Sequence, residues 1–407
     1  MLKQGHTHPL NIVVIVAALG YFVDIYDLIL FSIVRVPSLQ EIGIAADEIK
    51  NAGVYLLNMQ MIGMLLGGIV WGMLGDKKGR LSTLFLTILL YSLANIANGF
   101  VQTLNQYATL RIIAGFGLAG ELGIGITLVS EVMTKETRAW GTSIVSGIGI
   151  IGAALAFWVS EWGWRESYWV GGVLGLLLLG LRLYIHESGM FNKLKESTAK
   201  RGDFLSLFRN REKFIKYLAS IFVGVPVWFT IGVLVTFSKE FGEAIGVTGA
   251  VSPGKSIMYH YFGAALGSVI TGYISQKLKS RKKALWIAII SLSFLSVWYF
   301  SASGYTPEFL YLILFILGIA NGYWAVFVTV ASEQFGTNIR STATTTIPNF
   351  VRGATVPVLI WWKYMSESMG IIQSSMIVGA TVIVLAIVAV FFLEESYGKD
   401  LDYLETE

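Results

Sequence analysis

The 407-residue sequence contains no cysteine, and only 14% of its residues are charged. The absence of cysteine excludes disulfide bonds and thiolate metal sites. A soluble domain typically carries about 25% charged residues, so this low charge, beside 55% apolar residues and a mean hydropathy of +0.66, indicates a membrane protein. A Walker loop is also missing, because the glycine-rich stretch at 147–154 follows no strand and precedes no lysine. We therefore expect no direct use of ATP, no cofactor, no metal and no enzymatic activity.

Long apolar runs separate the clusters of charge. Runs of this kind match the roughly 20 residues that a transmembrane helix needs. The sequence therefore predicts an all-α integral membrane protein. We place twelve helices near residues 10–35, 51–74, 81–100, 105–130, 139–160, 167–185, 213–237, 255–275, 284–303, 308–332, 341–362 and 371–393.

Two short patterns recur at about half the chain length. The stretch from Ser130 to Arg138 reads S-E-x6-R, and the stretch from Ser332 to Arg340 reads the same. Gly72-Met-Leu-Gly-Asp-Lys corresponds in the same way to Gly272-Tyr-Ile-Ser-Gln-Lys. Such repeats are typical of transporters whose substrate pathway runs between two similar halves. We predict two pseudo-symmetric six-helix bundles and a hydrophilic cytoplasmic linker, at residues 1–186, 213–407 and 187–212.

Most of the lysines and arginines fall on one side of the predicted helices. The positive-inside rule then places both termini in the cytoplasm of a multi-pass plasma (inner) membrane protein. The pI near 9.0 reflects this bias, so we expect a lipid bilayer and no nucleic acid as partner. No cleavable signal peptide is expected. His6 and His8 are interpreted as part of a flexible terminus, and a monomer is expected.

The repeated patterns resemble the signatures of the major facilitator superfamily. Gly72-x3-Asp76-Lys77-x-Gly79-Arg80 is similar to its loop between helices 2 and 3, and Arg111-x3-Gly115 to its helix 4 arginine motif. Glu187-Ser188 and Glu395-Ser396 resemble the marks that end each half in the sugar-porter-like branch. The resemblance covers the whole chain and implies two six-helix bundles around a central cavity, working by alternating access. The second half departs from the loop signature, with Gln276 at the place of Asp76.

Acids at cytoplasmic helix ends can pair with arginines of neighbouring helices, and helix N-termini add partial positive charge. Such contacts would hold the cytoplasmic side closed. Topology determination by basic loops is the alternative, and we favour it for Lys77 and Lys78. We expect a cytoplasmic gate made of Asp76, Arg80, Glu131, Arg138, Glu333 and Arg340.

Ionisable residues at membrane depth are costly unless they are paired or hydrated. Asp24 and Asp27 share one face of helix 1, and Arg111 of helix 4 lies at a similar depth. Burial and like charge favour the protonated acid while an arginine favours the ionised one, so such a group can exchange a proton near neutral pH. Glu121 is a second proton-coupling candidate. A static ion network that fixes helix packing is the alternative.

The second half has fewer charges at membrane depth. Arg352, with Asn349 one turn before it, suits a bidentate contact with a substrate carboxylate. His260 could bind a proton or a polar solute. Aromatic and amide side chains could complete the cavity wall, although ordinary packing is the commoner role of each aromatic alone. These candidates are Trp228, Asn321, Tyr323 and Trp324.

Two local patterns bear on the substrate. Asp24-Ile-Tyr-Asp27 resembles the helix 1 motif of aromatic-acid/proton symporters, with Ile25 in place of the usual glycine, and Gly120-Glu121-Leu122-Gly123 resembles the metabolite/proton symporter branch. Both imply proton symport of a small organic solute. We predict a secondary active transporter of a small organic anion. Proton-coupled efflux or facilitated diffusion of a neutral solute such as a sugar or drug is the alternative, and a membrane receptor or scaffold would leave the intramembrane charges without a task.

Overall fold

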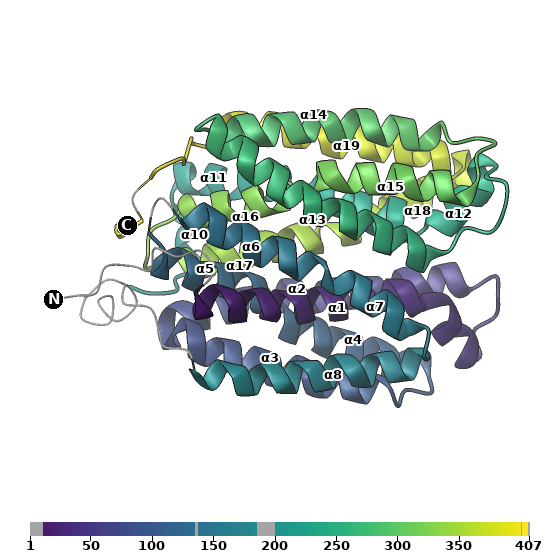
Figure 1. The fold of residues 1–407 in the computed structure, drawn as a ribbon, viewed down its shortest axis with the longest axis horizontal. Coiled ribbons are helices and arrows are strands. Elements are labelled where there is room, and N and C mark those ends of the chain that lie inside the picture. Colours follow the sequence, from purple (N-terminus) through teal and green to yellow (C-terminus); the bar gives the residue numbers. More distant parts are fainter. Residues whose placement is uncertain (1–10, 135–136, 185–199, 400, 406–407) are drawn as a thin grey trace.

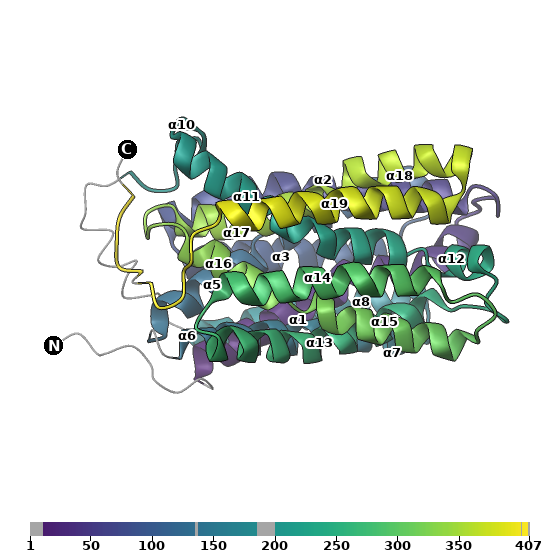
Figure 2. The ribbon, with the colours of Figure 1, turned by 90° about the horizontal axis from the view of Figure 1, so that it is seen from above.

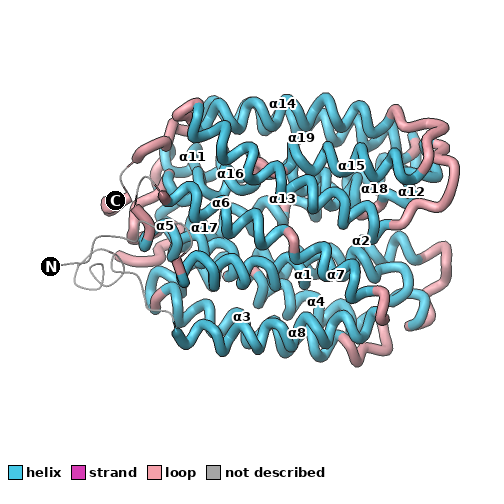
Figure 3. The backbone as a smooth tube through the Cα atoms, in the orientation of Figure 1, coloured by secondary structure: helices cyan, strands magenta, loops and turns pink. Residues whose placement is uncertain are grey.

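The computed structural model describes residues 11–134, 137–184, 200–399 and 401–405. Its helices run along one long axis, and the loops gather at the two ends of the bundle (Figures 1 and 3). The first and last described residues, Asn11 and Glu405, lie at the same end. We call this the terminal end, and the other the opposite end. Every one of the twelve predicted spans contains a helix or two consecutive helices, and the predicted fold class is confirmed.

The helices of the first half lie together in Figure 1, purple to blue-green. They are α1 (Ile12–Glu41), α2 (Ile49–Lys78), α3 (Arg80–Asn98), α4 (Leu104–Leu118), α5 (Glu121–Val132), α6 (Arg138–Ile150), α7 (Gly152–Ser160), α8 (Trp164–Leu181) and the 3₁₀ turn η1 (Arg182–Tyr184).

The helices of the second half form the other group, and Figure 2 shows α19 running alongside α11. They are α10 (Ser206–Arg209), α11 (Arg211–Phe229), the π-helix η2 (Thr230–Val235), α12 (Ser238–Ile245), α13 (Pro253–Lys277), α14 (Arg281–Phe300), α15 (Pro307–Asn321), α16 (Trp324–Glu333), α17 (Arg340–Gly353), α18 (Thr355–Met369) and α19 (Ile371–Phe392).

Helix breaks repeat at the same interval as the sequence patterns. The break between α4 and α5 follows Leu118, and the break between α15 and α16 follows Asn321, 203 residues later. The α6–α7 break after Ile150 likewise corresponds to the α17–α18 break after Gly353. Ser130 and Ser332, equivalent in the two halves, lie 3.4 Å apart between their hydroxyl oxygens. The local axis that relates the halves therefore passes close to these two serines.

Glycines allow equivalent helix pairs to pack closely. A Cβ at Gly63 of α2 would collide with the backbone of α4, and a Cβ at Gly263 of α13 would collide with the backbone of α15. Gly67 and Gly267 meet the facing helix in the same way, one turn further on. Small residues at such contacts are the usual means of helix association in a membrane.

Helix ends follow local capping chemistry. The side chain of Asn11 accepts hydrogen bonds from the N–H groups of Val13 and Val14 at the start of α1. Ser252 caps α13 by accepting from the N–H of Lys255, with a proline at the first helical position. Both arrangements satisfy amide groups that have no partner within the helix.

Nine helices or helix pairs of the described chain are long and apolar enough to cross a membrane. Among the remaining spans, α17 reads Arg-Ser-Thr-Ala-Thr-Thr-Thr at its start, and almost all of it is buried against other helices. A span that faces protein on all sides does not need an apolar surface, so its sequence is less apolar than a lipid-facing helix.

The linker and the C-terminal segment pack on the terminal end. The N–H of Gly202 donates to the carbonyl of Asn338, and a Cβ at Gly202 would meet the backbone of Met73. The N–H of Thr337 donates to the carbonyl of Tyr403. Residues 187–199 of the predicted linker, including the Glu187-Ser188 mark, lie outside the described residues.

Candidate functional site

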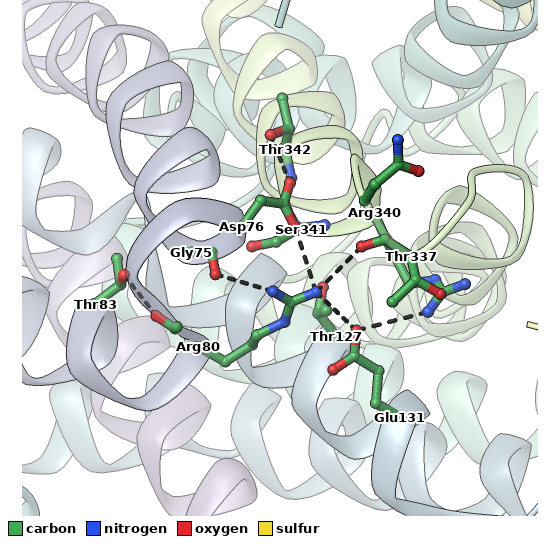
Figure 4. Close-up of polar contacts among 12 residues, drawn as sticks. Gly75, Asp76, Arg80, Thr83, Thr127, Glu131, Thr337, Arg340, Ser341 and Thr342 are labelled. Atoms are coloured by element: carbon green, nitrogen blue, oxygen red, sulfur yellow. Dashed lines mark hydrogen bonds and ion pairs between the residues drawn. The ribbon is translucent and has the colours of Figure 1, made fainter. Parts of the chain in front are cut away.

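Asp76 of α2 caps a helix of the other half (Figure 4). Its carboxylate accepts hydrogen bonds from the backbone N–H groups of Ser341, at 3.2 Å, and Thr342, at 2.8 Å, in the first turn of α17. The hydroxyl of Thr342 donates a third bond at 2.7 Å. A carboxylate at a helix N-terminus satisfies unpaired amides and interacts favourably with the helix dipole. Asp76 therefore ties the two halves together, and its role in a gate stays a prediction.

Arg80 extends this contact. Its guanidinium lies 2.8 Å from Glu131 and 3.3 Å from Asp76, and it donates to the carbonyl of Thr337 in the second half. Arg340 reaches back from α17 to Glu131 at 3.6 Å. We call Asp76, Arg80, Glu131 and Arg340 the clasp. All four side chains are buried, so their charges have little solvent to replace a lost partner.

Two predicted gate residues remain, and the structure describes the side chain of one of them, Glu333. Arg138 begins α6, but its side chain lies outside the part of the chain that is described. Glu333 differs from expectation: it pairs with Arg281 at 3.2 Å and accepts from Ser396 at 2.8 Å, within its own half. Arg340, from the same sequence pattern as Glu333, points instead toward Glu131 and the carbonyl of Leu401.

An ion pair also joins the halves at the opposite end. Arg35 of α1 donates to Glu240 of α12 at 2.9 Å, and its guanidinium lies 4.7 Å from the ring centre of Phe237. Glycine at position 53 leaves room for the Arg35 side chain. The two halves are therefore in contact at both ends of the molecule.

Between the two ends, Asp24 of α1 faces Arg352 of α17. Their side chains are buried, with 3.7 Å between the nearest oxygen and nitrogen. Neither oxygen of Asp24 has a hydrogen-bond partner among the described residues, and two nitrogens of Arg352 have none. The pair is a loose contact between the halves. Arg352 also lies over the rings of Trp228, at 5.6 Å, and Trp324, at 5.8 Å.

Asp27 and Arg111 occupy a separate region within the first half. Arg111 donates to the amide oxygen of Gln60 and lies 3.4 Å from the hydroxyl of Tyr168. Asp27 is buried, and its oxygens have no hydrogen-bond partner among the described residues. Asp27 packs against Gly171, where a Cβ would collide with it. The expected cluster of two aspartates sharing Arg111 is therefore divided, because Asp24 turns toward Arg352.

Glu121 has a complete set of partners. It forms an ion pair of 2.6 Å with Arg182 and accepts a hydrogen bond of 2.7 Å from Thr87. Gly20 of α1 makes room for the guanidinium of Arg182. A buried carboxylate with this much compensation favours the alternative of a packing pair over that of a proton carrier.

A narrow cavity lies between the halves beside the Asp24–Arg352 pair. Its volume is about 20 Å³, room for little more than one water molecule. It is lined by Tyr21, Ile25, Ile150, Val227, Trp228, Ile231, Tyr261, Ala264, Asn321 and Trp324. Ile231, which lines the cavity, belongs to the π-helix η2, and such irregular turns occur often at functional sites.

Three predicted binding residues are not among those that line this cavity. His260 contacts the carbonyl of Leu314 and the amide of Asn321, and Tyr323 donates to the carbonyl of Val223. Asn349 donates to the carbonyl of Ala119 in the other half and accepts from Arg352 at 3.3 Å. These three side chains position the lining residues or join helices. Three other candidates line the cavity: Trp228, Asn321 and Trp324.

A sequence profile described as Major Facilitator Superfamily matches residues 17–355, which is most of the chain. The chain belongs to the major facilitator superfamily. This membership makes it a multi-pass membrane transporter, and the expectation that it is no enzyme is confirmed.

Known transporters resemble the chain over most of its length. A probable 4-methylmuconolactone transporter of Cupriavidus pinatubonensis is 26% identical, covering 79% of this chain and 76% of its own. The 3-(3-hydroxy-phenyl)propionate transporter of Escherichia coli is 28% identical, covering 87% and 89%. The solved structure of the proton:xylose symporter XylE, bound to 6-bromo-6-deoxy-D-glucose, has a TM-score of 0.75 at 16% identity, covering 96% and 97%, which shows the shared fold.

Several contacts of this major facilitator protein were not predicted from its sequence. Arg182 stands at the end of a predicted span, and its position inside an apolar run is a signal that could have singled it out. Gln60 and Tyr168, the partners of Arg111, are uncharged and have no such signal. The pair of Arg35 and Glu240 joins residues more than 200 positions apart, and only the packing of α1 against the second half brings them together.

Proposed function

We propose that the chain imports a small organic carboxylate together with a proton, by alternating access, with its terminal end in the cytoplasm of the plasma membrane. The observation that carries the proposal is the buried, loose contact between Asp24 and Arg352 across the two halves. An arginine with unsatisfied donors beside an aromatic cavity is suited to a carboxylate, which can accept two parallel hydrogen bonds.

In this proposal Arg352 exchanges one carboxylate partner for another. With no substrate, Asp24 is ionised and neutralises Arg352 while the empty protein switches between its inward-facing and outward-facing states. When the substrate carboxylate pairs with Arg352, Asp24 loses its cation and takes up a proton. Asp27, one turn away on α1, lies in the separate region of Arg111 and stays a proposed proton-coupling residue. Both the loaded and the empty states then carry no uncompensated charge at the centre of the bundle. This matters because a buried charge without a partner is costly.

The relatives support an organic acid as the solute. The 3-(3-hydroxy-phenyl)propionate transporter is named for a carboxylate with an aromatic ring, and the walls of the cavity include Tyr21, Trp228 and Trp324. Indole rings offer flat apolar surface that suits an aromatic ring. Tyr21 accepts a hydrogen bond from Trp324 at 3.0 Å, which holds one wall in place across the two halves.

The contacts at the two ends fit an occluded stage of the cycle. The clasp closes the terminal end, and Arg35 with Glu240 closes the opposite end. The cavity between them is too small for a ring-containing acid, so one end must open to admit it. Each pair at an end would therefore break in turn as the halves rock about the central site.

The test is uptake by the purified protein in proteoliposomes, with 3-phenylpropionate as probe and protein-free liposomes as control for passive entry. An inward proton gradient should drive accumulation. Arg352→Lys keeps the charge but loses the planar fork, so binding should weaken by about 1–3 kcal/mol. Arg352→Gln should lose binding while the protein still inserts. Uptake of neutral sugars without any response to pH would instead support facilitated diffusion.

A further inference from the structure

Asn321 presents an unused hydrogen-bond acceptor to the central cavity. It is buried at 2% exposure, lines the cavity, and its Oδ1 has no hydrogen-bond partner among the described residues. An amide oxygen buried in this way costs free energy until a donor reaches it. Asn321 also lines the cavity, so a ligand that enters there can supply the missing donor.

The orientation of this amide is fixed by two neighbours. Its Nδ2 lies 3.3 Å from the carbonyl of Val227, which can only accept, so the NH₂ group must be on that side. The same nitrogen lies 3.1 Å from Nε2 of His260. Nδ1 of His260 lies 3.2 Å from the carbonyl of Leu314 and must donate, which leaves Nε2 of the neutral ring as an acceptor. Every contact agrees, and Oδ1 is the atom left for the cavity.

We propose that Asn321 binds a hydroxyl group of the substrate, that His260 is the positioning residue for this amide, and that the preferred substrates are hydroxylated aromatic carboxylates. The proposal rests on the proposed function and adds a second recognition point to it. A phenolic O–H donates to Asn321 Oδ1. The same hydroxyl can accept from Tyr261, whose Oη also has no partner among the described residues and whose ring lines the same cavity.

The geometry separates the two recognition points. Arg352 lies against the rings of Trp228 and Trp324, which pack edge to face at 6.5 Å. Asn321 ends α15 and Arg352 belongs to α17, so the amide and the guanidinium come from different helices, with Trp324 of α16 contacting the guanidinium. A substrate with a donor at the ring is favoured over one with a bare ring, because binding a bare ring leaves the buried amide oxygen unpaired.

The experiment compares 3-(3-hydroxyphenyl)propionate with 3-phenylpropionate, which differ by one hydroxyl group, in proteoliposomes of the full chain. For the parent protein, KM for the hydroxylated acid should be roughly 10-fold lower, the worth of one well-formed hydrogen bond. The measure is the ratio of the two KM values within each variant. Asn321→Leu should bring this ratio close to one, and His260→Leu should reduce it in part, because the amide is then free to rotate.

The outcomes separate this inference from the proposed function. If the parent protein transports both acids with equal KM, Asn321 does not read a hydroxyl and the inference is overturned, while carboxylate transport stands. If Asn321→Leu keeps the parent's preference, the inference is overturned as well. If neither acid is transported and neither shifts the melting temperature of the parent protein, the proposed function itself fails. Should Asn321→Leu not insert, the parent's preference and its reduction in His260→Leu still decide the matter.

Discussion

Asp76 and Glu395 both cap helix N-termini at the terminal end. They differ in whether the capped helix belongs to the other half or to the same half as the carboxylate. Asp76 of the first half caps α17 of the second. Glu395 of the second half caps α14 of the same half, accepting from the N–H of Arg281 at 2.9 Å. The local chemistry is the same, since each carboxylate satisfies unpaired amides at a helix start. The difference is that only the first contact must break when the halves separate at this end.

The arginine–glutamate pairs of the two repeats differ in the same way. Glu131 meets Arg80 of its own half and Arg340 of the other, whereas Glu333 meets Arg281 of its own half. Duplicated residues have thus come to serve either the interface between the halves or the interior of one half. We expect contacts between the halves to control transport, and contacts within a half to control stability.

The largest effect is expected at the centre of the interface. Asp24→Asn cannot release a proton, so Arg352 has no anionic partner in the empty protein. Net accumulation driven by a proton gradient should be lost, because the empty protein then returns with a buried unpaired cation. Exchange of external labelled substrate for unlabelled substrate inside the vesicles should persist, since the substrate-bound state of the protein is unchanged. Radiolabelled uptake and exchange, measured side by side, test this, and accumulation at the level of the parent would remove Asp24 from the coupling site.

A contact within one half should behave differently. Glu121→Gln leaves Arg182 buried without its counter-charge, which costs about 3 kcal/mol in folding stability. The melting temperature in detergent should fall, while the variant that remains folded should still couple uptake to pH. Thr87→Val, which removes one hydrogen bond to Glu121, is the milder companion. A stable Glu121→Gln protein that has lost its pH response would show that Glu121 carries the proton after all.

The clasp gives the third comparison. Asp76→Asn weakens charge-assisted bonds to α17 and should cost the closed terminal end about 1–3 kcal/mol. Spin labels at the terminal ends of α5 and α16 should report longer distances. Glu240→Gln, at the opposite end, should shift the population the other way.

Gln276 supplies the matched control for the clasp. It stands at the position of Asp76 in the second repeat, is half-buried, and has no side-chain hydrogen bond among the described residues. Gln276→Leu should therefore leave the spin-label distances unchanged. Equal shifts in Asp76→Asn and Gln276→Leu would contradict the role given to the clasp.

The smallest effect is expected at Glu395. Burial alone would raise the pKa of Glu395, but hydrogen bonds from Ser280 and from backbone N–H groups, including that of Arg281, hold it below its usual value. A lowered pKa contributes stability above the pKa of the unfolded chain, about 4.3, and this contribution is lost as the pH falls through the folded value. Glu395 is partly exposed, so Glu395→Gln should cost less than about 1 kcal/mol at pH 7. The difference in melting temperature between variant and parent should shrink as the pH falls below about 4.3 and vanish below the folded pKa. A difference that widens on acidification would contradict the lowered pKa.

The fold could be predicted from the sequence because helix length, the half-chain repeat and the glycine positions are local signals. Pairing could be predicted only in part. Asp76 and Glu131 lie in motifs whose partners also lie in motifs, so the clasp was expected. The turn of Asp24 toward Arg352 depends on how α1 packs against α17, and single helices do not carry that information. Glu333 follows the same sequence pattern as Glu131, yet it pairs with Arg281 of its own half.

The direct test of the central claim is proton movement caused by substrate. Proteoliposomes with a pH-sensitive dye inside and no imposed gradient are exposed to 3-(3-hydroxyphenyl)propionate, and the signal of protein-free liposomes is subtracted. We expect internal acidification with the parent protein and none with Arg352→Gln. Asp24→Asn should exchange substrate across the membrane without acidifying the interior. Substrate entry through the parent protein with no change of internal pH would contradict it.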